Sequence, residues 1–365
     1  MARNKRDIAF GTMNLYNLQS PGKPMYPRST PYTQEEYEEK IAWTAELLKG
    51  LEADVIAFQE LWAPECLVDL FEKAGLAQTY ELAFIKDGGW DGIAVAAAVR
   101  KPWAIAGSVR HKDFPAGFKL KKRDRTMREI INEPTEVDLL DDESLLPNHE
   151  DDDISVSISR FSRSALQVSV RHSEVDDVPE IQVFCTHLKS KLPTRIDLEE
   201  FRDDRIKPHR DALGAALSTI RRTAEAAALR VILNETMKDN DVPVVVLGDL
   251  NDGQFSNTLG ILSDQPSYRL YADSRTARRN DDGLFTAVNM QQLRSLKDYL
   301  YTHEFKGIRE VIDHVMVSEQ FYDHANGRLW AFREMHVLND HIGHKEGRIK
   351  SDHAFLQARF DWLPA

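Results

Sequence analysis

Short apolar runs that stop abruptly at acidic or amide side chains restrict the fold of this chain more than any other feature. Val244–Leu247 is continuously apolar and leads into Gly248-Asp249, and residues 54–58 lead into Gln59-Glu60. Runs this short and apolar are typical of strands buried on both faces. Other strands and amphipathic helices lie between them. The pattern predicts a mixed α/β sandwich in which one rim gathers the loops that follow the strands.

The remaining elements follow from the same periodicities. Thr33 and Glu36 form a capping box, apolar residues recur at helical spacing behind it, and Gly50 is expected to end that helix. A second, Ala- and Arg-rich helix is expected over 208–237. No internal repeat of fixed period is present. Further strands are expected at 8–15, 92–99, 154–170, 181–186 and 354–360, and a hairpin pairs 299–305 with 310–317 around Lys306-Gly307.

The charge of the chain is unevenly distributed. Its 365 residues carry 47 Lys and Arg against 59 Asp and Glu, a net charge of −12. Ten acids and no base lie between Glu133 and Asp153, and the rest of the chain is nearly neutral. Six bases between Lys119 and Arg128 precede this acidic block. We interpret residues 1–365 as one domain with a charged insertion at about 115–153, either two solvated stretches or a basic flap over the active site.

Composition excludes several classes of protein. The hydrophobic content of 42% is that of a globular chain, and no run approaches the roughly 20 apolar residues of a membrane span. The basic start lacks the apolar segment of a signal peptide. Two cysteines, Cys66 and Cys185, cannot build a disulfide scaffold or a thiolate zinc site. A reducing, cytoplasmic compartment is expected.

The polar residues at the strand ends have an ordinary structural explanation when each is taken alone, because Asn and Asp are common turn residues. Taken together, their oxygens are the ligands that Mg²⁺ prefers, and two histidines accompany them. These are the groups needed for metal-assisted attack of water on phosphorus. The set comprises Asn14, Glu60, His187, Asp249, Asn251, Asp313, Asp352 and His353.

Six strings carry a resemblance to a known family. GTMNLYNL, VIAFQELW, FCTHLKSK, VVVLGDLND, VIDHVMVS and KSDHAFL occur in the order and spacing of the endonuclease/exonuclease/phosphatase superfamily. The resemblance covers the whole chain apart from the insertion. It implies a four-layer α/β sandwich, with two mixed β-sheets packed face to face and helices outside. It also implies Mg²⁺- or Mn²⁺-dependent phosphoester hydrolysis.

The same resemblance implies a role for each residue. Glu60 resembles the main metal ligand, helped by Asn14 and Asp352. Asp249 resembles the residue that positions or deprotonates the attacking water, and Asn251 the one that holds the phosphate. His353, oriented by Asp313, would face the scissile phosphate, and His187 would donate a hydrogen bond to it. Whether Asp249 or His353 is the general base stays open. Two departures are that Ala354-Phe355 follows the SDH string and that His314 replaces a usual Tyr.

The substrate is less constrained by the sequence. The HLKSK string resembles the non-specific nuclease branch, and Arg163, Lys189 and Lys191 are either ordinary surface bases or a grip on phosphates. Trp62 and Trp90 either pack in the core or stack on a base. We favour a nuclease acting on DNA or RNA. The alternatives are a phosphatase or phosphodiesterase of a small phosphoester or phospholipid headgroup, and a catalytically silent binding scaffold.

Overall fold

The computed structural model describes residues 4–85, 92–121, 155–264, 283–295, 300–342 and 347–363. The chain divides into two compact units, one made of Met1–Phe114 and Arg160–Ala365 and the other of Pro115–Ser159. In the smaller unit two short strands, β6 (Leu120–Lys121) and β7 (Ser155–Val156), pair antiparallel. The acidic block of the predicted insertion lies outside the described residues.

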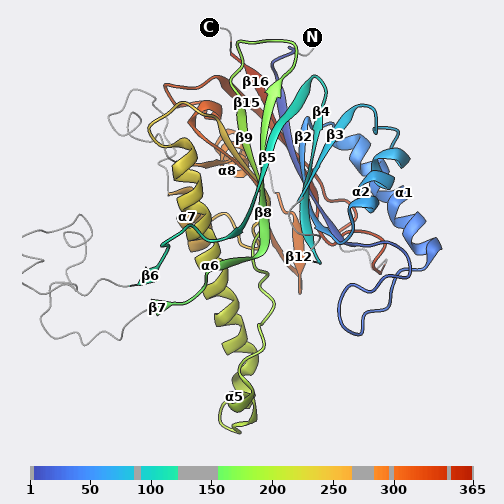
Figure 1. The fold of residues 1–365 in the computed structure, drawn as a ribbon, viewed down its shortest axis with the longest axis vertical. Coiled ribbons are helices and arrows are strands. Elements are labelled where there is room, and N and C mark those ends of the chain that lie inside the picture. The colour runs from blue at the N-terminus through green and yellow to red at the C-terminus, as the bar shows by residue number, and fades with distance from the viewer. Residues whose placement is uncertain are drawn as a thin grey trace, which may run out of the picture. The chain divides into compact units, whose positions relative to one another are not determined.

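Two six-stranded sheets form the larger unit (Figure 1). Both are mixed, because β1 pairs parallel with β2 and β9 parallel with β10 while their other pairings are antiparallel. The first sheet has the order β15 (Trp330–Leu338), β16 (Phe355–Trp362), β1 (Ile8–Leu18), β2 (Val55–Leu61), β4 (Ala94–Arg100), β3 (Tyr80–Phe84). The second has the order β11 (Phe285–Thr286), β14 (Asp313–Val317), β10 (Val244–Asp249), β9 (Ile181–His187), β8 (Arg160–His172), β5 (Trp103–Asp113).

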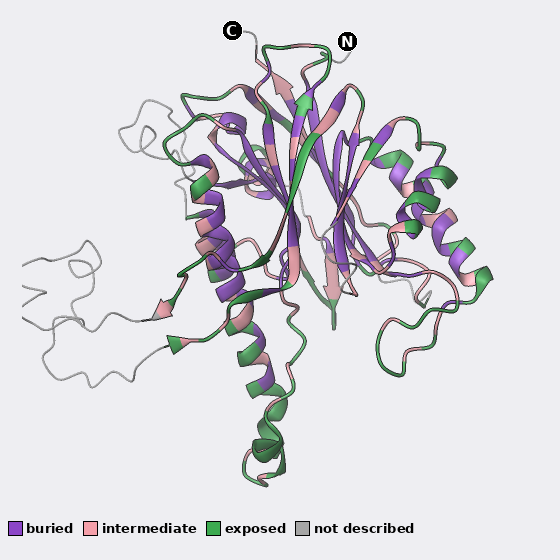
Figure 2. Cartoon of the chain, viewed as in Figure 1, coloured by how far each residue is buried: buried purple, intermediate pink, exposed green. Residues whose placement is uncertain are grey.

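Alternation along the strands separates two buried cores. In β1, Ile8 and Phe10 belong to the core between the sheets, whereas Ala9 and Met13 face the helices outside. Figure 2 shows the central strands of both sheets buried along most of their length, whereas the edge strand β5 (Trp103–Asp113) is largely exposed. The four-layer α/β sandwich predicted from the sequence is confirmed. In the described part of the chain the helices are α1 (Gln34–Leu51), α2 (Pro64–Lys73), α5 (Leu198–Arg202), α6 (Arg210–Met237), α7 (Asn257–Ser263) and α8 (Ala287–Arg294). Short 3₁₀ turns are η2 (Lys207–His209) and η4 (Glu319–Phe321).

Helix α1 begins as its capping box predicts. The Thr33 hydroxyl accepts from the Glu36 amide, and the Glu36 carboxylate accepts from the Thr33 amide. The helix ends one residue after Gly50, at Leu51, because Glu52 adopts the left-handed conformation that closes it. The predicted start of α1 is therefore confirmed, and its end lies one residue later than expected.

A membrane-spanning helix must be both long and apolar. None of the described helices is both long enough and apolar enough to cross a bilayer.

The predicted hairpin is only partly correct. Its two arms are short, β12 (His303–Phe305) and β13 (Ile308–Glu310), and β14 is a separate strand of the second sheet. The Thr302 hydroxyl accepts hydrogen bonds from the amides of Ile312 and Asp313, which turns the chain between β13 and β14. This tertiary contact, which no local pattern reveals, divides the apparent long strand in two.

Gly248 is required where β10 approaches β9. Its φ is +144°, and a Cβ added there would lie 1.9 Å from the carbonyl oxygen of Thr186. Gly50, by contrast, has open space around its Cα. The missing side chain of Gly248 therefore lets the strand that ends at Asp249 lie against the strand that ends at His187.

We expect Gly248→Ala to lower the free energy of unfolding by more than about 3 kcal/mol, since both the backbone conformation and the contact must change. Gly50→Ala is the matched control, and it should leave stability unchanged or raise it by up to about 1 kcal/mol. Urea unfolding followed by circular dichroism measures both. Equal stability of the two variants would contradict the steric role of Gly248.

Candidate active site

The register of the second sheet aligns three of the predicted site residues. Asp249 pairs with His187 of β9 on one side and with Asp313 of β14 on the other. Residues directly opposite one another in a sheet project from the same face. All three side chains are buried. The order of the strands therefore brings together an imidazole and two carboxylates that lie far apart in the sequence.

Two irregularities in the first sheet place Asn14 and Glu60 at the same rim. The β1–β2 pairing shifts register between Asn14 and Leu18, and the β2–β4 pairing shifts between Phe58 and Leu61. Glu60 itself has a φ of +59°, rare for a residue other than glycine. The irregular backbone at the ends of β1 and β2 thus displaces Glu60 from regular strand alternation at this rim.

Hydrogen bonds join the two sheets at this rim. The Asn14 amide Nδ2 donates to Asp249 Oδ2 at 3.1 Å, and Nδ1 of His353 lies 2.9 Å from Asp313 Oδ2. His187 Nε2 lies 3.4 Å from the same Oδ2 of Asp249, and His353 Nε2 lies 3.9 Å from it. One carboxylate oxygen of Asp249 is therefore the meeting point of an amide and two imidazoles.

The SDH segment is fixed to the first sheet by its serine. The Ser351 hydroxyl donates to the carbonyl oxygen of Asn14, and it accepts from the amide of His353. Asp352 between them is turned outward, with its side chain 49% exposed and one oxygen 4.0 Å from His353 Nε2. His353 is therefore held in place by the strand that carries Asn14, while Asp352 stays accessible.

Burial and neighbouring charges shift the pKa values of His353 and Asp313 in opposite directions. Burial by itself would lower the pKa of His353, but the carboxylates of Asp313 and Asp249 hold it well above its usual range. Burial raises the pKa of Asp313 to about 6, against the opposing effect of the His353 charge. Near neutral pH the pair is thus an imidazolium bound to a carboxylate.

The pKa values of Asp249 and His187 are both lowered, but by different causes. Burial alone would raise the pKa of Asp249, yet the His353 charge and the hydrogen bond from His187 hold it below its usual range. Burial lowers the pKa of His187, and the nearby positive charge of Arg163 lowers it further. Asp249 is therefore ionised and His187 is neutral at physiological pH.

Asn251 is held beside Asp249 by its own backbone. Its amide nitrogen donates to Asp249 Oδ1 at 2.9 Å, and its side-chain Nδ2 donates to the Leu188 carbonyl at 3.1 Å. Its φ of +55° is tolerated because Asn adopts the left-handed region more readily than most residues. The side chain is buried next to the loop that follows His187.

The three predicted phosphate-binding bases have different surroundings. Arg163 Nη1 donates to the Leu188 carbonyl at 2.9 Å, which places its guanidinium beside the His187 loop. Lys189 Nζ donates to carbonyls of its own loop. Lys191 Nζ lies 2.8 Å from a carboxylate oxygen of Glu310. Only Arg163 is thus directed by the fold toward the buried cluster.

The donor chemistry of the rim suits a hard divalent cation. Glu60 Oε2 accepts from the amide of Asn17, and Asn14 Oδ1 accepts from the amide of Tyr16. Burial raises the pKa of Tyr16, and the negative charges of Asp352 and Glu60 raise it further. Both carboxylates therefore lie close enough to Tyr16 to act on the same hydroxyl. Two groups of described residues have ligand atoms within 4.8 Å of one another: His303, Asp352 and His353, and Asp249, Asp313 and His353.

Two residues beside the site were not predicted. Lys40 of α1 is fully buried, its Nζ donates to the carbonyls of Arg348 and Ile349, and burial lowers its pKa to about 7. The sequence held a signal for it, since a lysine falls on the apolar face beside Ile41. His303 pairs with His353 through an isolated β-bridge, and nothing in the sequence pattern singles it out.

Of the two tryptophans considered for base stacking, the structure describes Trp62. Trp62 is half-buried, its Nε1 donates to Asn17 Oδ1, and its ring meets the edge of Tyr26 at 4.9 Å between centroids. It therefore lies beside the strand end that carries Asn14, with part of its ring exposed. Trp90 lies outside the described residues.

A family model supplies the identification. The model described as the Endonuclease/Exonuclease/phosphatase family matches residues 15–353, which include every predicted site residue except Asn14. The chain belongs to this family. Its members are phosphoester hydrolases, and the acid and histidine cluster described above is one that a divalent cation fits. A search of curated proteins found no match.

Solved structures of family members share the fold. A family protein from Bacteroides thetaiotaomicron is 13% identical with a TM-score of 0.53, covering 98% of this chain and 99% of its own. A mannosyl-6-phosphatase from the same organism is 13% identical with a TM-score of 0.52, covering 97% and 100%. A truncated TDP2 from Caenorhabditis elegans is 12% identical with a TM-score of 0.51, covering 98% of each. At these identities the comparisons show a common architecture.

His314 is the departure from the usual family pattern that the structure explains. It is fully buried, its Nε2 lies 2.9 Å from the Asp252 carbonyl oxygen, and its Nδ1 has no hydrogen-bond partner among the described residues. Burial lowers its pKa to about 4. The ring thus bonds as a neutral donor, and protonation would place a positive charge in the buried interior.

Because the pKa of His314 is lower in the folded than in the unfolded chain, the unfolded chain binds the extra proton between about pH 6.5 and pH 4. Its contribution to stability is therefore present above pH 6.5 and lost as pH falls, by about 2 kcal/mol at pH 5. Urea unfolding at pH 7.5 and pH 5 measures this loss. His314→Phe should show a smaller loss by that amount; an equal loss in both proteins would contradict the assignment.

Proposed function

We propose that this protein is a divalent-metal-dependent phosphodiesterase that hydrolyses DNA or RNA by attack of water on phosphorus. The observation that carries the proposal is the convergence of Asn14, His187 and His353 on one oxygen of Asp249. An ionised carboxylate that is held in place by oriented donors can position a water molecule in line with the phosphorus atom. The neighbouring imidazoles can stabilise the negative charge that develops on the phosphoryl oxygens. The family membership supports phosphoester hydrolysis in general.

In this proposal Glu60, Asn14 and Asp352 hold the metal ion. Their oxygens are hard donors at the rim, and Asp352 is exposed enough to reach a ligand. Mg²⁺ or Mn²⁺ bound there would neutralise charge on the phosphoryl oxygens. Asn17 and Tyr16, which donate to Glu60 and Asn14, keep those oxygens oriented.

Asp249 positions the attacking water and accepts its proton. Its Oδ1 is held by the Asn251 amide and its Oδ2 by Asn14, so the carboxylate is ordered before substrate binds. Its charge remains at neutral pH, as a base requires. The second hydrogen of the Asn251 side-chain amide holds a phosphate oxygen in this scheme.

His353 stabilises negative charge as an imidazolium. The hydrogen bond to Asp313 orients the ring and maintains its charge, and the Nε2 side of the ring faces Asp249. This favours Asp249 over His353 as the general base, the question that the sequence left open. His187 is neutral and buried, so it has one N–H, and in this scheme that N–H turns from Asp249 to the developing phosphorane.

Two other functions are weighed against this one. Hydrolysis of a small phosphoester is the second candidate, since one structure with the same fold is a mannosyl-6-phosphatase. A phospholipid headgroup would be a substrate of the same kind. A silent scaffold is disfavoured because the predicted polar residues are all present and most are buried together. We also propose a reducing, cytoplasmic setting, in keeping with the two free, buried cysteines.

Asp249→Ala should lower kcat on single-stranded DNA and on bis-p-nitrophenyl phosphate by about 10²–10⁴-fold, the loss typical of a positioned base. Assays with Mg²⁺, Mn²⁺ and EDTA on plasmid DNA, RNA, bis-p-nitrophenyl phosphate and a monoester measure it. The exposed Asp239→Ala is the control and should keep wild-type rates. Activity on monoesters alone would exclude the nuclease, and more than a tenth of wild-type turnover in Asp249→Ala would exclude the role of Asp249.

Glu60→Gln should raise the Mn²⁺ concentration for half-maximal activity at least about 10-fold, because a neutral amide replaces the charged ligand. Isothermal titration with Mn²⁺ gives a second readout that is independent of turnover. The exposed Glu39→Gln in α1 removes one acid elsewhere and should change neither quantity. Unchanged Mn²⁺ affinity in Glu60→Gln would remove Glu60 from the metal site.

A further inference from the structure

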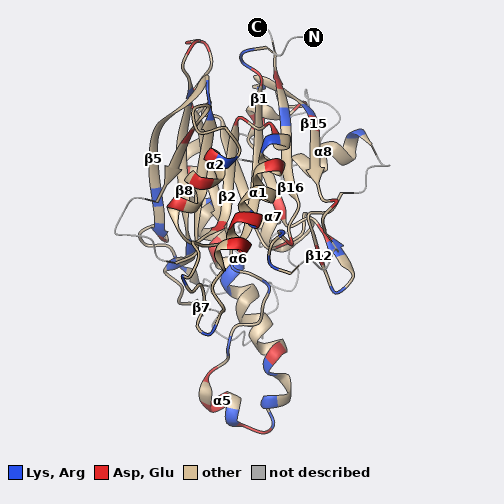
Figure 3. Cartoon of the chain, turned by 90° about the vertical axis from the view of Figure 1, so that its right-hand side faces the viewer, with Lys and Arg blue, Asp and Glu red and all other residues tan. Residues whose placement is uncertain are grey.

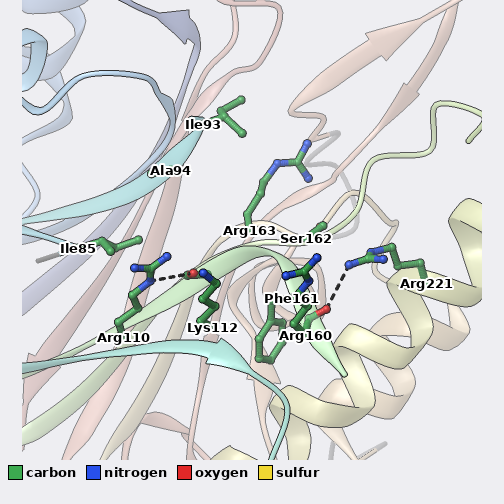
Figure 4. Close-up of a pocket in the computed structure, with 11 residues that line it drawn as sticks. Ile85, Ile93, Ala94, Arg110, Lys112, Arg160, Phe161, Ser162, Arg163 and Arg221 are labelled. Carbon is green, nitrogen blue, oxygen red and sulfur yellow. Dashed lines mark hydrogen bonds between the residues drawn. The ribbon is translucent and has the colours of Figure 1, made fainter. Parts of the chain in front are cut away.

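A cavity lies on the β8 side of the loop that follows His187. It has a volume of about 380 Å³ and opens between the ends of β5 and β8 and the helix α6 (Figure 4). Arg110 and Lys112 reach it from β5, Arg160 and Arg163 from β8, and Arg221 from α6. We call this cavity, defined by those five side chains, the cationic pocket.

The lining of the cationic pocket has one sign of charge. The eleven described residues that line it include five bases and no carboxylate, and the remainder are apolar residues and two serines. Figure 3 shows acidic and basic residues interspersed along the ribbon in that view. Arg221 Nε also lies 3.2 Å from a carboxylate oxygen of Glu225, which is outside the lining. Several guanidinium and ammonium groups around one cavity offer an anion charged hydrogen-bond donors from more than one side.

Arg163 connects the pocket to the reaction centre. Its guanidinium lines the cavity and also donates to the Leu188 carbonyl, next to His187. Its Nε is buried and has no hydrogen-bond partner among the described residues. The buried carboxylate of Glu225 accepts from the amides of Ser162 and Lys189, which ties the pocket wall to the His187 loop.

The apolar part of the lining suits the rest of a nucleotide. Phe161 is buried at the base of the pocket, and Ile85 and Ala94 line it from the first sheet. An inorganic ion would make no use of these surfaces. A phosphate carried on a sugar or a base would contact both the bases and the apolar wall.

We propose that the cationic pocket binds a second phosphate group of the substrate, next along from the scissile one. The inference rests on the proposed function and narrows it: the substrate carries at least two phosphates, as a nucleic acid strand or a polyphosphorylated small molecule does. Arg163 lies between the two phosphate positions, and Lys112 and Arg160 contact the outer one. A phosphoester with a single phosphate leaves the pocket empty.

Binding separates this inference from catalysis. In the Asp249→Ala background, the affinity for a fluorescein-labelled single-stranded 12-mer is measured by anisotropy over a series of NaCl concentrations. Lys112→Gln with Arg160→Gln should weaken binding at least about 10-fold and lower the slope of log Kd against log salt by about 0.7, the value for one phosphate contact. Arg171→Gln with Lys238→Gln removes two exposed bases elsewhere, one of them on β8, and should change neither quantity.

Two further measurements identify the source of the phosphate. Inorganic tripolyphosphate should displace the 12-mer from the parent protein at lower concentration than from the pocket variant. In the active enzyme, the ratio of kcat/KM for a tetranucleotide over bis-p-nitrophenyl phosphate should fall at least about 10-fold in the pocket variant. If the 12-mer does not bind, isothermal titration with tripolyphosphate replaces the displacement assay, and tighter binding of tripolyphosphate to the parent protein than to the pocket variant would assign the pocket to a small polyphosphorylated substrate.

Equal losses in the pocket and control variants, or equal losses on both substrates, would overturn the inference. Full activity of Asp249→Ala would instead overturn the proposed function, while the binding assay would still report on the pocket. Arg160→Gln alone, which changes one exposed side chain, repeats the test if the double variant is poorly folded. Circular dichroism and thermal melting establish the fold of each variant beforehand.

Discussion

Two buried carboxylates, Asp249 and Asp313, connect the packing of the sheets to the chemistry of the site. Both belong to the second sheet, and Asn14 and His353, which bond to them, belong to the first sheet or to the loop that leads into it. An unpaired carboxylate in such a place would cost several kcal/mol, so the sheets are most stable when these residues meet. The contact that holds the rim together is the same contact that orients the groups to which we assign the chemistry.

The backbone around this contact is strained in ways that serve it. Glu60 and Asn251 have positive φ values, and the β1–β2 and β2–β4 pairings shift register at the rim. Glycine is the residue type that position 248 requires, because β10 lies against the backbone of Thr186 there. Each feature costs free energy locally and directs a polar side chain to one place. The large apolar core between the sheets supplies the stability that sustains this cost.

Much of the candidate site could be proposed from the sequence because its residues follow strands whose apolar runs are visible there. Glu60 and Asp249 are examples, and the family motifs supplied their roles. What no local pattern shows is which distant strands become neighbours, so the pairing of His303 with His353 and of Lys191 with Glu310 was invisible. The hairpin was misjudged for the same reason, since the hydroxyl of Thr302 divides it through bonds to residues ten and eleven positions away. Lys40 was visible as a lysine on an apolar helix face, but only its tertiary partners explain it.

The order of the strands separates two kinds of charge across the site. Along the second sheet the sequence β8, β9, β10, β14 places Arg163, His187, Asp249 and Asp313 in that order. Glu60 and Asn14 lie at the strand ends of the first sheet and Asp352 in the segment that leads into it, where we propose the metal ion, while Arg163 lies beyond His187, where we propose a second phosphate. A net charge of −12 therefore says little about affinity for a polyanion. What decides that affinity is the local distribution of charge, which differs between the acids near the first sheet and the bases on the β8 side of the second sheet.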